Sequence, residues 1–156
     1  MVDDINFLKN LNNTFKKSDP EEILTATLTK IFKNNVAYVC SFGSESAIIL
    51  HMISKIDTKI PIILINTKFL FKETIEYKNY LIKKLKFKNC KEIFPNPSDL
   101  SEIDKHDDLW NSNPDLCCSI RKVLPLNKEL RKYSAWISGR KSYHKGERSL
   151  LENFEQ

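Results

Sequence analysis

Two short runs of apolar residues stand out along the chain. Residues 36–40 and residues 60–65 are almost continuously apolar over the length of a single strand. A strand that is buried on both faces has this pattern, whereas a strand with one wet face alternates. Each run is followed by a stretch whose apolar residues recur every three or four positions, as in an amphipathic helix. The pattern predicts an α/β fold, a parallel sheet with helices on both faces.

The same patterns predict the other elements. Helices are expected over residues 4–17, about 19–32, about 46–55, 73–87 and 115–133. Short strands are expected at residues 91–94 and 135–138. The polar stretch 98–115, which includes Asp104, is predicted to be a solvated connecting helix and loop. No repeat or linker divides the chain, and 156 residues are enough for one domain with a buried core.

Polar turns follow both apolar runs. Residues 41–46 (Ser-Phe-Gly-Ser-Glu-Ser) come after the first run, and residues 66–71 come after the second. The first turn leads into a helix, whose free N–H groups and dipole favour an anion. Taken alone, it is better explained as an ordinary turn with a serine cap. Because ligands of parallel sheets bind at the carboxyl ends of the strands, the shared location of both turns favours a binding site.

The four cysteines are Cys40, Cys90, Cys117 and Cys118. The first residues are acidic and lack the pattern of an export signal, so we expect a cytoplasmic protein without a disulfide framework. Cys40 lies in an apolar strand and is expected to be a small buried hydrophobe. Neighbouring cysteines seldom bond to each other, because the ring strains the peptide between them. In a reducing compartment, Cys117 and Cys118 could instead supply two thiolates to one metal centre.

Basic residues are the other chemical feature of the chain. The net charge of +5 is dispersed, and it suits a small anion and a nucleic acid about equally. Arg121 and Lys122 share a helix face with the cysteine pair, and a loop after the last predicted strand contains Arg140 and Arg148. An anion site and solvated surface charge explain these groups about equally well. No apolar run approaches the ~20 residues of a membrane span.

Four motifs, in this order, resemble those of the adenylyl-sulfate and phosphoadenylyl-sulfate (PAPS) reductase family of the PP-loop superfamily. The matching segments are residues 41–46 (a modified PP-loop), 66–74 (Asp-Thr-Gly to Pro-Glu-Thr in the family), 117–126 (Cys-Cys, Arg-Lys, Pro-Leu) and 135–141 (a strand and basic loop). The resemblance implies an adenine nucleotide α-hydrolase-like, Rossmann-like fold. It also implies assimilatory sulfate reduction, in which adenylyl sulfate is reduced to sulfite and AMP with thioredoxin as the reductant.

The resemblance implies roles for single residues. The nucleotide would be held by Ser41, Phe42, Gly43, Ser44, Glu45 and Ser46, and the nucleoside pocket would be lined by Asn66, Thr67 and Leu70. The phosphosulfate would be held by Lys122, Arg140 and Arg148, with Arg121 in support. Cys117 and Cys118 would be two of the four thiolate ligands of a 4Fe–4S cluster. Paired cysteines mark the cluster-bearing branch, which mostly uses adenylyl sulfate.

Several positions depart from the family pattern. The family Asp is Asn66 here, the family Gly is Lys68 and the family Pro is Lys72. Lys68 replaces a residue suited to close backbone approach, so we expect weaker nucleotide binding or a differently set loop. The family's second cysteine pair and its nucleophilic cysteine have no counterpart after Cys118. We therefore expect residues 1–156 to be one domain that lacks its C-terminal segment and supplies the substrate-binding part, with no catalytic nucleophile of its own.

Two other interpretations stay open. One is a nucleotide-binding module without reductase activity, completed by a second chain. The other is a PP-loop ATP pyrophosphatase or sulfurtransferase, although residues 41–46 lack the second Gly and the Asp of that group's Ser-Gly-Gly-x-Asp-Ser loop. The expected partners are adenylyl sulfate or phosphoadenylyl sulfate and thioredoxin, with no nucleic acid or membrane. A homo-oligomer or a C-terminal partner chain is compatible with the sequence.

Overall fold

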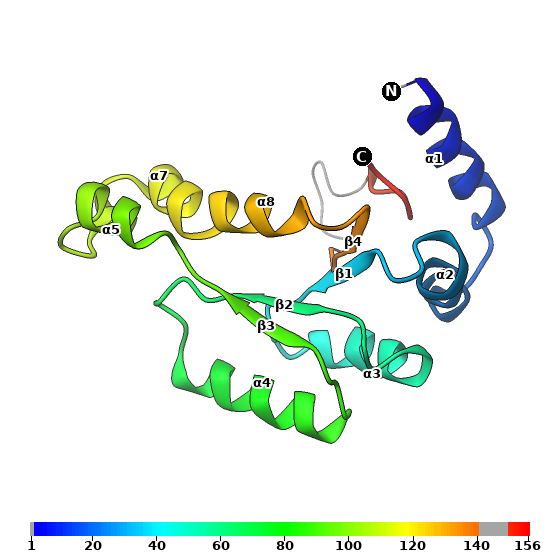
Figure 1. The fold of residues 1–156 in the computed structure, drawn as a ribbon, viewed down its shortest axis with the longest axis horizontal. Coiled ribbons are helices and arrows are strands. Elements are labelled where there is room, and N and C mark those ends of the chain that lie inside the picture. Colours follow the sequence, from blue (N-terminus) through cyan, green and yellow to red (C-terminus); the bar gives the residue numbers. More distant parts are fainter. Residues whose placement is uncertain (1, 141–149) are drawn as a thin grey trace.

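The computed structural model describes residues 2–140 and 150–156. Its strands are β1 (Val36–Val39), β2 (Ile62–Ile65), β3 (Cys90–Ile93) and β4 (Ala135–Ile137). They form one sheet in the order β3-β2-β1-β4, and every neighbouring pair is parallel (Figure 1). The predicted α/β class is confirmed, and the two apolar runs form the two central strands.

The helices lie close to the predicted segments. They are α1 (Val2–Thr14), α2 (Pro20–Ala26), α3 (Ser46–Ile56), α4 (Lys72–Lys84), α5 (Pro97–Ile103), α6 (Leu109–Ser112), α7 (Pro114–Cys118) and α8 (Leu124–Leu130). Two π-helical turns extend them: η1 (Thr27–Ile31) follows α2, and η2 (Ser119–Val123) joins α7 to α8. Three helices begin in the same way, with an Asp or Asn side chain that caps the first turn and a Pro directly after it. The caps are Asp19, Asn96 and Asn113.

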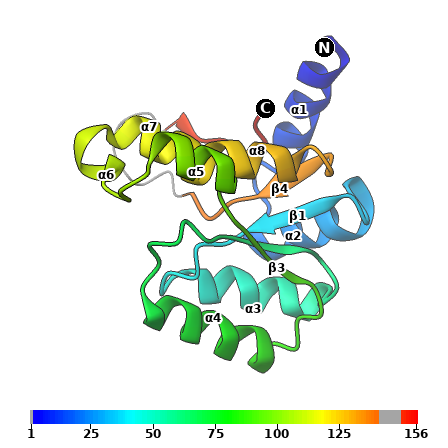
Figure 2. The same ribbon diagram turned by 60° about the vertical axis from the view of Figure 1, so that its left-hand side comes forward.

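The sheet is buried on both faces, which explains why its central strands are continuously apolar. Tyr38 and Ile62 face a large core that also contains residues of α3 and α4. Ala37 and Ile63 face a smaller core against residues of α8. Figure 2 shows the two layers, with α3 and α4 on one side of the sheet and α5 to α8 on the other. No helix among the described residues is long and apolar enough to cross a bilayer.

The prediction for the polar connector was wrong at one residue. Residues 98–115 contain α5 and α6, and most of their side chains are exposed, as expected. Asp104 is the exception among the polar residues described in this stretch, because its side chain is fully buried and pairs with Arg121. A carboxylate leaves water only where charged or hydrogen-bonding partners replace it. The connector is therefore anchored to the rest of the domain at this point.

Candidate functional site

A cavity of about 1050 Å³ opens at the carboxyl ends of β1 and β2 and beside the residues after β4. Its walls also include the start of α3, the loop after β2 and the stretch from α6 to η2. The predicted site residues that line it are Ser41, Gly43, Ser44, Glu45, Ser46, Thr67, Leu70, Cys117, Cys118, Arg121, Lys122 and Arg140. The predicted site residues come from distant parts of the chain, and most of them lie around this one cavity at the carboxyl edge of the sheet.

Three predicted residues are not among those that line the cavity. Phe42 has a left-handed φ of 54°, and its side chain is buried in the core. Asn66 directs its side-chain amide to Glu92 on β3. Arg148 lies outside the described residues. The structure therefore gives Phe42 and Asn66 roles in shaping the turns that border the cavity.

The turn after β1 leads directly into α3. The Ser46 N–H donates to the Gly43 carbonyl at 2.9 Å, which closes the turn. No side-chain hydrogen bond caps the first turn of α3 among the described residues. The turn is therefore not held by a serine cap, which was its ordinary explanation. The first N–H groups of α3 lie beside the cavity, where they and the helix dipole favour an anionic ligand.

Tyr38 and Cys40 form the floor of the cavity at this turn. The two side chains border the cavity together with Ser46. Burial raises the pKa of the Tyr38 phenol and also that of the Cys40 thiol. Gly139 passes close by, and a Cβ at this position would meet Cδ1 of Ile49 at 3.3 Å. Cys40 is buried, as predicted, and the thiol stays protonated near neutral pH.

The loop after β2 keeps a glycine-like backbone although it contains no glycine. Lys68 has a φ of 69°, in the left-handed region. Its N–H donates to Oδ1 of Asn66 at 3.0 Å, and the Phe69 N–H donates to Oγ1 of Thr67 at 3.2 Å. The Asn66 amide in turn donates to Glu92 at 2.8 Å, and Glu92 is paired with Lys78. An Asp at position 66 would face the Glu92 carboxylate, so Asn suits this neighbourhood better.

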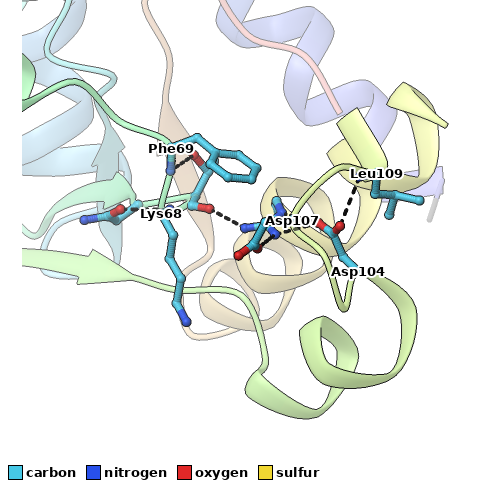
Figure 3. A network of polar contacts seen from close by, with 8 residues as sticks. Lys68, Phe69, Asp104, Asp107 and Leu109 are labelled. Atoms are coloured by element: carbon cyan, nitrogen blue, oxygen red, sulfur yellow. Dashed lines mark hydrogen bonds and ion pairs between the residues drawn. The ribbon is translucent and has the colours of Figure 1, made fainter. Parts of the chain in front are cut away.

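Arg121 links the loop after β2 to the polar connector. Figure 3 labels Phe69 of the loop and Asp104 and Asp107 of the connector. The Arg121 side chain is 1% exposed. Nε and Nη2 donate to Oδ2 of Asp104 at 3.0 and 2.5 Å, and Nη2 also donates to Asp107 at 2.5 Å. Nη1 donates to the Thr67 carbonyl at 2.9 Å, and the Phe69 ring lies 4.1 Å from Cζ. Arg121 is thus held mainly by protein groups, although part of it borders the cavity.

The ionisation of this pair follows from its surroundings. Burial acts to raise the pKa of the Asp104 carboxyl, but hydrogen bonds from Arg121 and the Leu109 N–H outweigh it and bring the pKa below its usual range. Burial likewise acts to lower the pKa of Arg121, and its hydrogen bonds to Asp104 and Asp107 outweigh this effect. Both side chains are charged at neutral pH. A buried pair of this kind is stable only with both partners in place.

The two cysteines and Lys122 line one wall of the cavity. Cys117 is buried, whereas Cys118 is exposed. Nζ of Lys122 lies 3.9 Å from Sγ of Cys118. A cubane iron–sulfur cluster takes four ligands, and among the described residues no group of three or more His, Cys, Asp or Glu side chains could hold a metal. The described residues therefore do not make up a full cluster site.

Arg140 borders the cavity from a separate segment, directly after β4. Its side chain is half exposed, and Nη1 lies 3.9 Å from a carboxylate oxygen of Glu155. At this distance and exposure the pair is weak. Arg140 could therefore bind an anion in the cavity with little loss of interaction energy from its ion pair with Glu155.

Several lining residues were not predicted from the sequence. The aromatic ones are Phe69 and Trp110, which are 43% and 60% exposed. Ile48 and Ile49 on α3 add apolar surface. Trp110 carried a usable signal, since a lone Trp in a polar connector is unusual on a surface that is otherwise solvated. The others looked like ordinary core residues of a helix or turn.

Comparison with known proteins agrees with this geometry. Residues 35–156 match the phosphoadenosine phosphosulfate reductase domain family. An adenosine 5′-phosphosulfate reductase of Mesorhizobium japonicum is 38% identical over 136 residues, which cover 87% of this chain and 54% of that protein. One from Bacillus mycoides is 42% identical over 121 residues, which cover 69% of this chain and 47% of that protein. The chain spans about half the length of these curated relatives.

A solved structure shares the fold. It is the phosphoadenylyl-sulfate (PAPS) reductase of Candida auris in a phosphate complex, with a TM-score of 0.71 and 28% sequence identity. The match covers 86% of this chain and 66% of that one. The sequence match extends over most of the chain and includes every segment that lines the cavity. The chain belongs to the phosphoadenosine phosphosulfate reductase domain family.

Proposed function

We propose that this chain binds adenylyl sulfate in the cavity and supplies the substrate-binding part of a reductase of sulfate assimilation. The complete reaction would reduce adenylyl sulfate to sulfite and AMP, with thioredoxin as the reductant. The names of the relatives support this substrate and reaction class. Since the chain spans about half of those relatives, we assign it substrate binding and leave the reduction itself to the complete system.

The observation that carries the proposal is the convergence of two kinds of surface on one cavity. Apolar side chains of α3 and β2, such as Ile48 and Leu64, suit a base and ribose, and the turn at residues 41–46 offers backbone N–H groups beside them. Two cations, Lys122 and Arg140, border the same space. A nucleotide with a sulfate at its end has both features, an apolar base and a compact anion that arginine binds well.

The sulfur chemistry needs a thiolate nucleophile. In the proposed reaction a thiolate attacks the sulfur, and the bond from sulfur to the AMP oxygen breaks to release AMP and form an S-sulfocysteine. A dithiol then attacks the cysteine sulfur, which breaks its bond to the sulfonate and releases sulfite, and the dithiol is oxidised to a disulfide. Cys40 is the buried cysteine at the floor, and burial raises the pKa of its thiol. A protonated thiol is a poor nucleophile. Cys117 and Cys118 also line the cavity, but we assign them to a cluster, so we place the attacking thiolate outside the described residues.

Cys117 and Cys118 are proposed as two ligands of a 4Fe–4S cluster. They are adjacent, border the cavity and lie beside Lys122, but they make up half of the usual thiolate set. The other two thiolates would come from another segment. We also infer a cytoplasmic location, because all four cysteines are free and a reducing compartment keeps them so.

Calorimetric titration tests the proposal. Adenylyl sulfate should bind to the wild-type chain, and Lys122→Ala and Arg140→Ala should each weaken binding by about tenfold, the effect of losing one charged hydrogen bond. Lys128→Ala is the matched control, because this exposed lysine lies on α8 and does not line the cavity. Binding of ATP with release of pyrophosphate would instead favour the pyrophosphatase interpretation, and equal binding by all variants would contradict the proposed site.

A further inference from the structure

We propose that Asp104 is a positioning residue of the ligand site. Through Arg121 it holds the loop after β2 against the helical stretch that carries Cys117, Cys118 and Lys122. Its role presupposes the ligand binding proposed for the cavity. Asp104 does not line the cavity itself, so its influence on a ligand passes through the groups that it holds.

Both oxygens of the Asp104 carboxylate are engaged. Oδ2 accepts from Nε and Nη2 of Arg121, and Oδ1 accepts from the Leu109 N–H at 3.0 Å (Figure 3). The side chains of Asp104 and Arg121 are 0% and 1% exposed. Removal of the Arg121 charge would leave the Asp104 carboxylate buried without an ion-pair partner, and removal of the Asp104 charge would leave the buried guanidinium with only the exposed Asp107 as a carboxylate partner. The pair therefore has one stable arrangement, which fixes the distance between the segments that supply it.

Three segments meet at the Arg121 guanidinium. The polar connector supplies Asp104 and Asp107, the loop after β2 supplies the Thr67 carbonyl and the Phe69 ring, and η2 supplies Arg121 itself. Arg121 thus contacts the backbone of the loop after β2, at the Thr67 carbonyl oxygen, and also a side chain of the same loop, the Phe69 ring. A planar guanidinium with fixed donors orients its partners more strictly than a lysine would.

Each of these segments also reaches the cavity within one residue of the contact. Lys122 follows Arg121, Trp110 follows Leu109, and Thr67 and Phe69 line the cavity directly. A ligand that touches the loop and Lys122 together meets groups whose spacing the buried pair sets. Displacement of a binding group by a fraction of its hydrogen-bond length is enough to weaken binding and to impair alignment.

The variant Asp104→Asn tests this role by calorimetry with adenylyl sulfate as the probe. It keeps the shape but removes the charge, and we expect the dissociation constant to rise by about tenfold or more. The matched control is Glu129→Gln. Glu129 is also a buried carboxylate paired with two cations, Lys91 and Lys132, but it lies on α8 and does not line the cavity. We expect the control to lower the melting temperature and to leave the dissociation constant within about twofold, since neither it nor its partners borders the cavity.

A double-mutant cycle distinguishes positioning from general destabilisation. Combined with Lys122→Ala, Asp104→Asn should weaken binding by less than the sum of the two single effects on the binding free energy. A Lys122 that Asp104→Asn has displaced contributes less to binding, so its removal has a smaller effect. Combined with Arg140→Ala, it should be additive, because Arg140 comes from the segment after β4 and has no contact with the pair among the described residues. Additivity in both cycles would overturn the role.

The remaining outcomes are also decisive. If Asp104→Asn does not fold, the double variant Asp104→Asn with Arg121→Gln removes both charges together, and it should fold and still bind weakly. Wild-type affinity in Asp104→Asn, or in the double variant, would overturn the positioning role while leaving the proposed function intact. Absence of binding by the wild-type chain would overturn the proposed function, and the positioning role with it.

Discussion

Lys68 has a backbone conformation that favours glycine, at the position where the resemblance to the family leads us to expect a glycine. Its φ of 69° is one that glycine adopts freely and lysine adopts at a cost. We expect Lys68→Gly to raise the free energy of unfolding by about 0.5–1 kcal/mol, the relief of the left-handed backbone less the greater flexibility of glycine when unfolded.

Urea unfolding of the Lys68 variants measures this effect, and Lys68→Ala is the control. Alanine keeps the Cβ and so keeps the strained backbone, and its stability should match that of the wild type. Equal stabilisation by Gly and Ala would show that the lysine side chain, and not the backbone, is unfavourable here.

Asn66 is a second departure with a local reason. Its amide donates to Glu92, which also pairs with Lys78. Asn66→Asp would place two carboxylates side by side, and we expect it to lower the free energy of unfolding by about 1–2 kcal/mol near neutral pH. Glu92→Gln in the same chain should restore most of the loss, because the Gln amide can donate to the carboxylate introduced at position 66. A loss that Glu92→Gln leaves unchanged would mean that the repulsion is not its cause.

At the scale of elements, the central strands carry the stability of the sheet. Ile63 on β2 is 0% exposed and packs in the core that includes Leu126 and Leu130 of α8. We expect Ile63→Ala to lower the free energy of unfolding by about 2–5 kcal/mol, the usual effect of a cavity in a packed core. Ile5→Ala on α1, where the side chain is 51% exposed, should change it by less than about 0.5 kcal/mol. Similar losses in urea unfolding would contradict the assigned packing.

The strands were predictable because a two-sided burial leaves a continuous apolar run, which is visible within a few residues of sequence. The turns at the edge of the sheet followed from the strands by geometry, and this brought Ser41, Thr67 and Arg140 together correctly. The burial of Asp104 was not predictable in this way. Its partner Arg121 lies on another helical segment, and a polar connector has no periodicity that marks one carboxylate as inward-facing. Trp110 was missed although a lone Trp in a polar connector is unusual, because that signal does not say which surface the ring lies against.

At the scale of the whole molecule, three carboxylates in different places link stability to pH. Hydrogen bonding to Lys78 lowers the pKa of Glu92. For Asp104 and Glu129 burial opposes the shift, but hydrogen bonds to their cationic partners still lower the pKa of each. A lowered folded-state pKa adds stability above the unfolded value, and this stability is lost as pH falls through the folded value.

We therefore expect the free energy of unfolding to fall steeply as pH drops from about 5 to about 3, as measured by urea unfolding at each pH. Asp104→Asn should be less stable than the wild type at neutral pH and should show a shallower fall, because one of the three groups no longer takes up a proton. An unchanged slope in this variant would exclude Asp104 as a contributor to the acid transition.

The most direct test of the binding claim is the change in backbone amide chemical shifts on titration with adenylyl sulfate. We predict the largest changes at Ser41, Gly43 and Ser46 in the turn after β1 and at Thr67 and Leu70 after β2, which line the cavity. The amides near Lys83, in the last turn of α4, and near Cys90, at the start of β3, should stay unchanged, because neither residue lines the cavity. Changes confined to residues outside the cavity, or none at saturating ligand, would contradict the assignment of this cavity as a nucleotide site.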